Sequence, residues 1–246
     1  MNKRIDTKSE RVFMSLVGLS GCGKTHFIFD LIRNNVFTPP FDKILYFYKY
    51  DQDIFKDAVK EFGADLIEFI EGVNFDLIKS LPADGTNYLL IFDDSCGDIC
   101  DTAELEDLAT AGRHKRLHVI YVKHNLFQKT KRRTTEIGTN YIVLFKNPRD
   151  KNQIQILANQ TKIPELVEWF NSATSKPYGN LMIDFSNKQD DHLRYSEGLN
   201  YTRFFLPKTK RRITFLKDVH TKLLYSEDSG AVAKKSRSDS NKELVQ

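Results

Sequence analysis

The most informative segment for the fold is Val12-Phe13-Met14-Ser15-Leu16-Val17-Gly18-Leu19-Ser20-Gly21-Cys22-Gly23-Lys24-Thr25. Its first six residues, Val12–Val17, form a short apolar run that is typical of a buried strand. The next eight match the pattern G-x-x-x-x-G-K-S/T without a mismatch, and a helical stretch, Thr25–Arg33, follows them. Strand, glycine-rich loop and helix in this order predict a phosphate-binding loop.

Each residue type in this loop has a chemical purpose. Glycines at 18, 21 and 23 let the loop fold tightly enough for its N–H groups to converge on phosphate oxygens. Lys24 would reach the β- and γ-phosphates, and the Thr25 hydroxyl would coordinate Mg²⁺. The alternative is a glycine-rich turn that matches by chance. We expect ATP to bind the whole loop, which comprises Gly18, Leu19, Ser20, Gly21, Cys22, Gly23, Lys24 and Thr25.

A second motif supplies carboxylates at the end of a hydrophobic run, Tyr88-Leu89-Leu90-Ile91-Phe92-Asp93-Asp94. Asp93 is the expected Mg²⁺ residue, and Asp94 is positioned to polarise the attacking water. Because Asp94 is one methylene shorter than the Glu usual in such ATPases, another carboxylate is an alternative base. Asp94 as a simple turn cap is a further alternative. The two motifs together predict an Mg-dependent ATPase.

Apolar runs alternate with helical stretches along the first 150 residues. This alternation predicts an α/β fold with a mostly parallel central sheet and helices on both faces. The expected strands are Val12–Val17, Ile44–Tyr48, Tyr88–Phe92, Val119–Val122 and Tyr141–Phe145, with a further short strand at Leu66–Ile70. The expected helices are Thr25–Arg33, Asp53–Phe62, Glu104–Ala111 and Thr130–Glu136. A helix starting at Ile163-Pro164-Glu165 and a last apolar run, Leu181–Phe185, follow them.

Composition and charge place limits on the class of protein. The 246 residues carry a net charge of +4, and residues 201–246 hold eleven Lys/Arg against five Asp/Glu. We expect an ATPase domain over residues 1–185 and a basic, partly disordered tail over 186–246. Three cysteines cannot all pair within one chain, and no apolar run reaches the roughly 18 residues of a membrane helix. We therefore expect an intracellular protein with no membrane contact.

A zinc site is an alternative use of some of these residues. Cys96, Cys100, His114 and His118 have spacings close to those of a two-Cys, two-His zinc finger. The segment between the cysteines and histidines lacks an aromatic residue, however, and His118 opens a β-rich run rather than lying on a helix. A zinc site is therefore a less favoured interpretation of this sequence than an ATPase.

Polar and basic residues follow the fourth strand. His124 and Asn125 would lie beside the γ-phosphate and orient water, or would form a simple polar turn. Beyond them a basic cluster would contact a phosphate backbone or form a solvated helix face. This cluster contains Lys129, Lys131, Arg132 and Arg133.

Several stretches resemble the A32-like DNA-packaging ATPases of Polinton (Maverick) elements and adintovirus-like viruses. Besides the two motifs, the resemblance rests on Gly112-Arg113-His114, Asn125-Leu126-Phe127, Leu144-Phe145-Lys146-Asn147-Pro148-Arg149-Asp150 and Ala173-Thr174-Ser175-Lys176-Pro177-Tyr178-Gly179. It runs from about Val12 to Phe185. The chain departs from the family at His124, where relatives usually carry Gln before Asn-Leu-Phe, and the departure puts the phosphate-sensing step in question.

The resemblance implies a FtsK/HerA-type core with strand order 5-1-4-3-2. It also implies a ring homo-oligomer that drives double-stranded DNA into a capsid through a portal or vertex, with Arg113 as an arginine finger for the neighbouring subunit. Pro207-Lys208-Thr209-Lys210-Arg211-Arg212-Ile213 is similar to a short nuclear-import signal, which suits assembly in a host nucleus, although a loose DNA-binding tail would look the same.

The leading functional hypothesis is an ATP-driven DNA translocase for genome packaging. A slow nucleotide-dependent switch or scaffold without motor activity is the alternative, and a small nucleotide kinase is a third possibility. GTP specificity is disfavoured because neither Lys123-His124-Asn125 nor Lys146-Asn147-Pro148-Arg149-Asp150 fits an Asn/Thr-Lys-x-Asp base-reading element.

Overall fold

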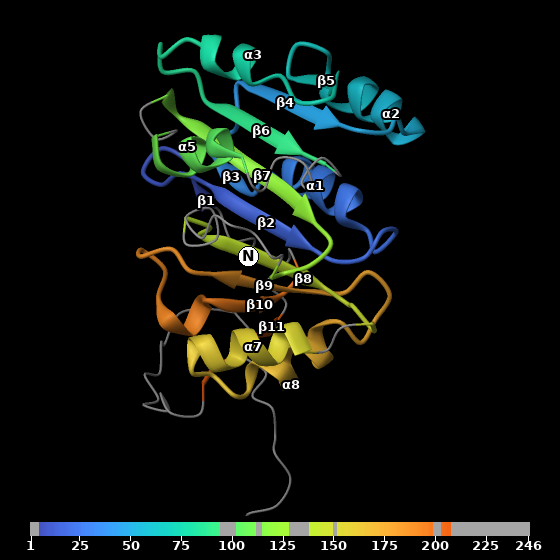
Figure 1. Cartoon of the computed structure of the whole chain (residues 1–246), viewed down its shortest axis with the longest axis vertical. Helices are drawn as coiled ribbons and strands as arrows, with labels where there is room; N and C mark the ends of the chain where they lie inside the picture. Colours follow the sequence, from blue (N-terminus) through green and yellow to red (C-terminus); the bar gives the residue numbers. More distant parts are fainter. Residues whose placement is uncertain are drawn as a thin grey trace, which may run out of the picture.

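The computed structural model describes residues 5–93, 102–111, 115–127, 138–149, 152–198 and 203–207. Within these residues the chain forms one large twisted sheet with helices on both faces, and a separate pair of short parallel strands, β1 (Ile5–Asp6) and β3 (Phe37–Thr38) (Figure 1). The α/β fold with a mostly parallel sheet, expected from the alternation of strands and helices, is confirmed.

The six parallel strands form the centre and one end of the sheet. Parallel strands buried on both faces are rich in apolar residues throughout, as β2 and β6 are here. The strands are β2 (Phe13–Val17), β4 (Lys43–Tyr48), β5 (Ile67–Glu71), β6 (Tyr88–Phe92), β7 (Leu117–Lys123) and β8 (Tyr141–Phe145). Their order in the sheet, β8-β2-β7-β6-β4-β5, reproduces the expected 5-1-4-3-2 arrangement, with β5 added beyond β4.

Three further strands extend the sheet beyond β8 in antiparallel pairing. They are β9 (Asn180–Asp184), β10 (Tyr195–Glu197) and β11 (Arg203–Phe204). The last two lie past residue 185, where the sequence analysis placed the domain boundary, so the described residues up to 207 continue the sheet. Phe205 is buried and stacks on Trp169 with ring centroids 5.6 Å apart, which fixes this segment to the domain.

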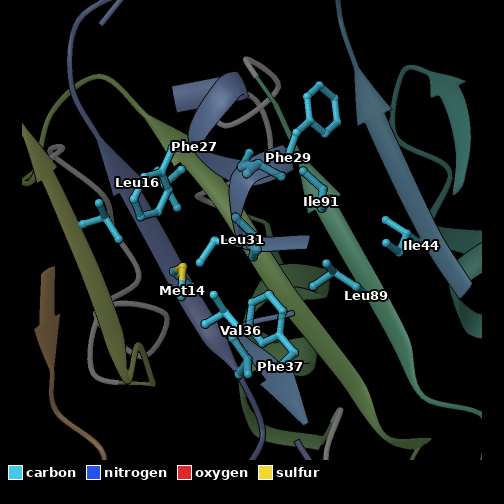
Figure 2. Packing of buried hydrophobic residues seen from close by; sticks show 14 of the residues in the cluster. Met14, Leu16, Phe27, Phe29, Leu31, Val36, Phe37, Ile44, Leu89 and Ile91 are labelled. Atoms are coloured by element: carbon cyan, nitrogen blue, oxygen red, sulfur yellow. The ribbon is translucent and has the colours of Figure 1, made fainter. Parts of the chain in front are cut away.

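One face of the sheet is covered by α1 (Lys24–Arg33) and α2 (Asp53–Phe62). Figure 2 shows part of this layer, in which Met14 and Leu16 of β2, Ile44 of β4 and Leu89 and Ile91 of β6 belong to one buried cluster with apolar side chains of α1. These residues alternate along their strands because successive strand side chains point to opposite faces. Burying each such side chain stabilises the fold by about 1.5–3 kcal/mol.

Among the described residues, four helices cover the opposite face. These are α3 (Phe75–Ser80), α5 (Ala103–Ala111), α7 (Asn152–Thr161) and α8 (Leu166–Ala173). The sequence analysis had no prediction for α3 or α7, because both are short or weakly amphipathic. A 3-10 turn, η2 (Asp191–Leu193), precedes β10. The expected helix Thr130–Glu136 lies outside the described residues. No helix within the described part of the chain combines the length and apolar character needed to cross a bilayer.

Candidate functional site

The glycine-rich loop lies at the carboxyl end of β2, in the middle of the sheet, and leads directly into α1. Gly21 and Gly23 have φ values of 75° and 98°, a left-handed region in which a side chain would be strained. Gly18 is restricted by space instead: a Cβ built on it would lie 2.7 Å from both Cys22 Sγ and Phe145 Cβ. The three glycines are therefore required by the shape of the loop.

Lys24, the first residue of α1, folds back over the loop. Its side chain is buried, and its Nζ donates hydrogen bonds to the backbone carbonyls of Gly18 at 2.9 Å and Leu19 at 2.8 Å. Cys22 lies beside it, and burial raises the pKa of the Cys22 thiol, against the opposing effect of the Lys24 charge. An ammonium group fixed beside a glycine-rich loop at the N-terminus of a helix is suited to hold a polyphosphate.

Asp93 reaches the loop from β6. It continues the alternation of Leu89 and Ile91, so its carboxylate points to the α1 face of the sheet. There its Oδ2 accepts hydrogen bonds from Thr25 Oγ1 at 3.2 Å and from Tyr46 Oη at 2.5 Å, and the residue is only 3% exposed. The structure thus brings the expected metal residues, Thr25 and Asp93, together.

Tyr46 was not singled out by the sequence analysis. It lies on β4 next to β6, paired with Ile91, and its ring is fully buried among aromatic side chains. The only signal in the sequence was a polar hydroxyl in the middle of an apolar strand. Such a group needs a partner when buried, but the sequence does not reveal which one.

The donor set at this end of the loop is suited to a hard cation. A threonine hydroxyl and an aspartate carboxylate are oxygen ligands, which Mg²⁺ prefers, and Mg²⁺ binds through one or two carboxylates while keeping waters and phosphate oxygens as its other ligands. The 3.2 Å separation of Thr25 Oγ1 and Asp93 Oδ2 means that one ion can contact both atoms. We conclude that Thr25 and Asp93 fit a magnesium site.

A cleft of about 890 Å³ opens around the loop. This volume lies within the range of pockets that hold small molecules and cofactors. Its lining extends from Asp93 on one side of α1 to residues of β8 and β9 on the other. The lining comprises Ser20, Gly21, Gly23, Lys24, Thr25, His26, Phe27, Asp30, Asn34, Gln52, Asp53, Ile54, Asp93, Phe145, Tyr178 and Asn180.

His124 and Asn125 follow the carboxyl end of β7 and are exposed. The preceding residue, Lys123, pairs with Val17, and its carbonyl accepts a hydrogen bond from the Gly18 N–H at 3.1 Å. The two residues therefore come directly after the point where β7 contacts the first residue of the loop, although neither lines the cleft.

Asn125 has a partner that the sequence analysis missed. Its Oδ1 accepts a hydrogen bond from Gln153 Nε2 at 3.2 Å, and Gln153 Oε1 accepts one from the Leu126 N–H. Gln153 belongs to α7, so the segment after β7 is attached to a helix on the far face of the sheet. Gln153 is one of three glutamines in α7, and nothing in the sequence distinguishes it as the residue that makes this contact.

Several expected site residues lie outside the described residues. They are the candidate base Asp94, the candidate finger Arg113 and the basic cluster Lys129, Lys131, Arg132 and Arg133. Cys96, Cys100 and His114 of the zinc alternative also lie outside, as does the tail after residue 207.

His118, the remaining residue of the zinc alternative, is described and buried on β7. Its Nδ1 accepts a hydrogen bond from the Val12 N–H at 3.0 Å, so this nitrogen already has a structural partner. Burial, with smaller contributions from the charges of Arg11 and Arg116, lowers its pKa from 6.5 to about 4. His118 is therefore a neutral core residue at physiological pH.

The sheet order, the loop at the end of β2 and the Thr25–Asp93 pair define a protein with the P-loop NTPase fold. No family model and no curated protein matches the sequence. Among solved structures, the chain is similar to the genome packaging NTPase B204 from Sulfolobus turreted icosahedral virus 2 in complex with ATP-gammaS. The TM-score is 0.53 at 16% identity, covering 76% of this chain and 96% of that one.

Two further structures support the same fold. The B204 complex with AMPPCP has a TM-score of 0.53 at 16% identity, covering 76% of this chain and 97% of that one. B204, the DNA-packaging ATPase from Sulfolobus Turreted Icosahedral Virus, has a TM-score of 0.51 at 13% identity, covering 80% and 98%. The likeness therefore extends over almost the whole of B204, and at this identity it is a likeness of fold.

Proposed function

We propose that this chain is an Mg-dependent ATPase that drives double-stranded DNA into capsids. The main support for ATPase activity is the contact of Thr25 with Asp93 at 3.2 Å. This contact lies directly beside the phosphate-binding loop, over which Lys24 is folded. The DNA-packaging step is supported by the likeness to B204, whose structures are described as those of a genome packaging NTPase.

The roles of the described residues follow from their positions. Backbone N–H groups of the loop and the N-terminus of α1 would hold the phosphates, and Lys24 would exchange its carbonyl acceptors for β- and γ-phosphate oxygens. Thr25 and Asp93 would hold Mg²⁺, whose charge offsets that of the phosphates. Asp94, the proposed base, would orient the attacking water.

We also propose that the chain belongs to the A32-like packaging ATPases. The Lys-Asn-Pro-Arg-Asp and Ser-Lys-Pro-Tyr-Gly stretches support an A32-like packaging ATPase of the Polinton and adintovirus-like kind, acting in the host nucleus or at a viral assembly site. Such a motor would work as a ring at a portal or vertex. Lys129, Lys131, Arg132 and Arg133 are the proposed contacts to the DNA backbone.

The test is the rate of ATP hydrolysis with and without long double-stranded DNA. A packaging motor should be stimulated by DNA, and Lys24→Ala should abolish turnover in both conditions because the transferring phosphate loses its fixed counter-ion. Binding of ATP with slow turnover that DNA does not change would instead favour a nucleotide-dependent switch or scaffold. Wild-type turnover in the Lys24→Ala variant would contradict the site assignment itself.

The proposed arginine finger has a separate test. Arg113→Ala should bind ATP normally and lose turnover by about 10³- to 10⁵-fold, since such fingers stabilise charge on the phosphoryl group. Mixing Arg113→Ala subunits with Lys24→Ala subunits should restore part of the activity, because an interface with an intact loop and an intact Arg113 can then form. Failure of every mixture, with co-assembly shown by light scattering, would contradict a role in trans.

A further inference from the structure

The turn before β9 holds a tyrosine in a conformation that tyrosine rarely adopts. The Gly179 N–H donates to the Lys176 carbonyl at 3.1 Å, Pro177 occupies the second position, and Tyr178 at the third position has a φ of 61°. Pro followed by a positive φ is the pattern of a type II turn, whose third position is usually Gly or Asn. A tyrosine at this position strains the backbone, so the presence of this residue type needs an explanation.

Burial does not explain Tyr178. Its side chain is 71% exposed, the largest exposure among the exposed large hydrophobic residues of the described chain. The ring lies against the phosphate loop, since a Cβ built on Gly23 would be 3.0 Å from Cδ1 of Tyr178. An aromatic face beside the loop is therefore held open to the cleft, where it gains little from the hydrophobic effect of folding.

The turn is held in place by its neighbours. A Cβ on Gly179 would collide with the backbone carbonyls of Ala173 and Lys176, so the chain passes tightly against the end of α8. The Thr174 N–H continues that helix by donating to the Phe170 carbonyl at 2.9 Å. Tyr178 is thus presented by a rigid support, which reduces the entropy lost when a ligand stacks on it.

Tyr178 lies on the side of the phosphate loop where the base of a bound nucleotide would be expected. Asp93 lies at the end of β6, on one side of β2, whereas Tyr178 precedes β9, on the other side beyond β8. If Asp93 holds the metal, the β- and γ-phosphates would lie toward the β6 side. The ribose and base must then leave the loop toward β8 and β9, where Phe145, Tyr178 and Asn180 line the same cleft.

Asn180 adds a polar group on this side. Its Nδ2 donates to the Tyr178 carbonyl at 3.4 Å, and its buried Oδ1 has no hydrogen-bond partner among the described residues. A buried acceptor without a partner is uncommon in folded proteins. The amide therefore supports the turn and keeps hydrogen-bonding capacity at the edge of the cleft.

We propose that Tyr178 is the stacking platform for the nucleobase, so that the chain selects a nucleoside triphosphate, purines above pyrimidines, over a bare polyphosphate. This inference rests on the proposed function, because it takes ATP as the ligand of the loop. Stacking of a base on an aromatic side chain contributes enough that its removal weakens binding by about 5- to 150-fold.

The experiment compares the binding of ATP, CTP and inorganic tripolyphosphate by isothermal titration calorimetry, with full-length wild type and three variants. Tyr178→Ala and Tyr178→Gly should weaken ATP binding by about 5- to 150-fold and leave tripolyphosphate binding unchanged. Tyr178→Phe keeps the ring and should bind ATP within about twofold of wild type, since stacking needs the π face rather than the hydroxyl. The preference for ATP over CTP should shrink in the Ala and Gly variants.

Tyr178→Gly also controls for folding. Glycine relieves the strain of the positive φ, so the midpoint of thermal unfolding should stay the same or rise while ATP affinity falls. Equal losses of ATP and tripolyphosphate affinity, or no loss of either, would overturn the role of Tyr178 and leave the ATPase proposal standing. If wild type binds neither ligand, the proposed function fails as well.

Discussion

Replacing Tyr46 by phenylalanine is a direct test of how the metal residue Asp93 is held. The hydroxyl of Tyr46 donates to Asp93 Oδ2 at 2.5 Å, with the tyrosine fully buried and the aspartate 3% exposed. Such a charge-assisted bond away from water contributes about 1.5–3 kcal/mol. Tyr46→Phe should therefore lower the free energy of unfolding by this amount, which corresponds to a fall of about 3–12 °C in Tm for a domain of this size.

Tyr121→Phe provides a matched control. Tyr121 is equally buried, and its hydroxyl shares a hydrogen bond of 2.6 Å with Thr139 Oγ1 on the other face of the sheet. Because both partners are neutral, its loss should cost only about 0.5–1.5 kcal/mol. Chemical denaturation of both variants measures the difference, and a Tyr46→Phe cost no larger than that of Tyr121→Phe would refute the charged nature of the first bond.

The same pair of variants separates stability from metal binding. Removing an outer partner of a metal ligand usually costs about 10- to 100-fold in metal affinity or activity. Tyr46→Phe should therefore shift the Mg²⁺ concentration needed for half-maximal ATP hydrolysis upward by about this factor, while Tyr121→Phe should leave it unchanged. An equal Mg²⁺ dependence in the two variants would mean that Tyr46 serves packing alone.

Two other changes test parts of the site and core. Gly18→Ala should cost about 1–3 kcal/mol of stability and weaken ATP binding, because the new Cβ would lie 2.7 Å from Phe145 Cβ; unchanged melting and binding would show that the loop relaxes freely. His118 is neutral in the folded protein with a pKa of about 4 but protonates near 6.5 when the chain is unfolded. Its contribution to the free energy of unfolding is therefore fully present above pH 6.5. Stability should fall by up to about 3 kcal/mol as pH drops from 6.5 to 4, and denaturation of His118→Gln should show a flatter profile.

The local elements of this protein could be predicted from short stretches of its sequence. Strand, glycine-rich loop and helix in residues 12–25 follow from an apolar run, from the conformational freedom of Gly21 and Gly23, and from the residues after Lys24. The parallel strands could be predicted because their apolar runs reflect burial on both faces. Thr25 and Asp93 could be predicted as partners because two short motifs encode them.

Contacts between side chains that are distant in the sequence depend on the tertiary fold. Tyr46 contacts Asp93 because strand order and register place β4 beside β6, and Gln153 contacts Asn125 because α7 packs under the segment after β7. The antiparallel strands β10 and β11 were missed because two or three residues carry too little periodicity to predict a strand. Tyr178 reaches the phosphate loop only because the turn before β9 folds back against Gly23. Such contacts depend on register and packing between elements, and neither is written in the local pattern of residues.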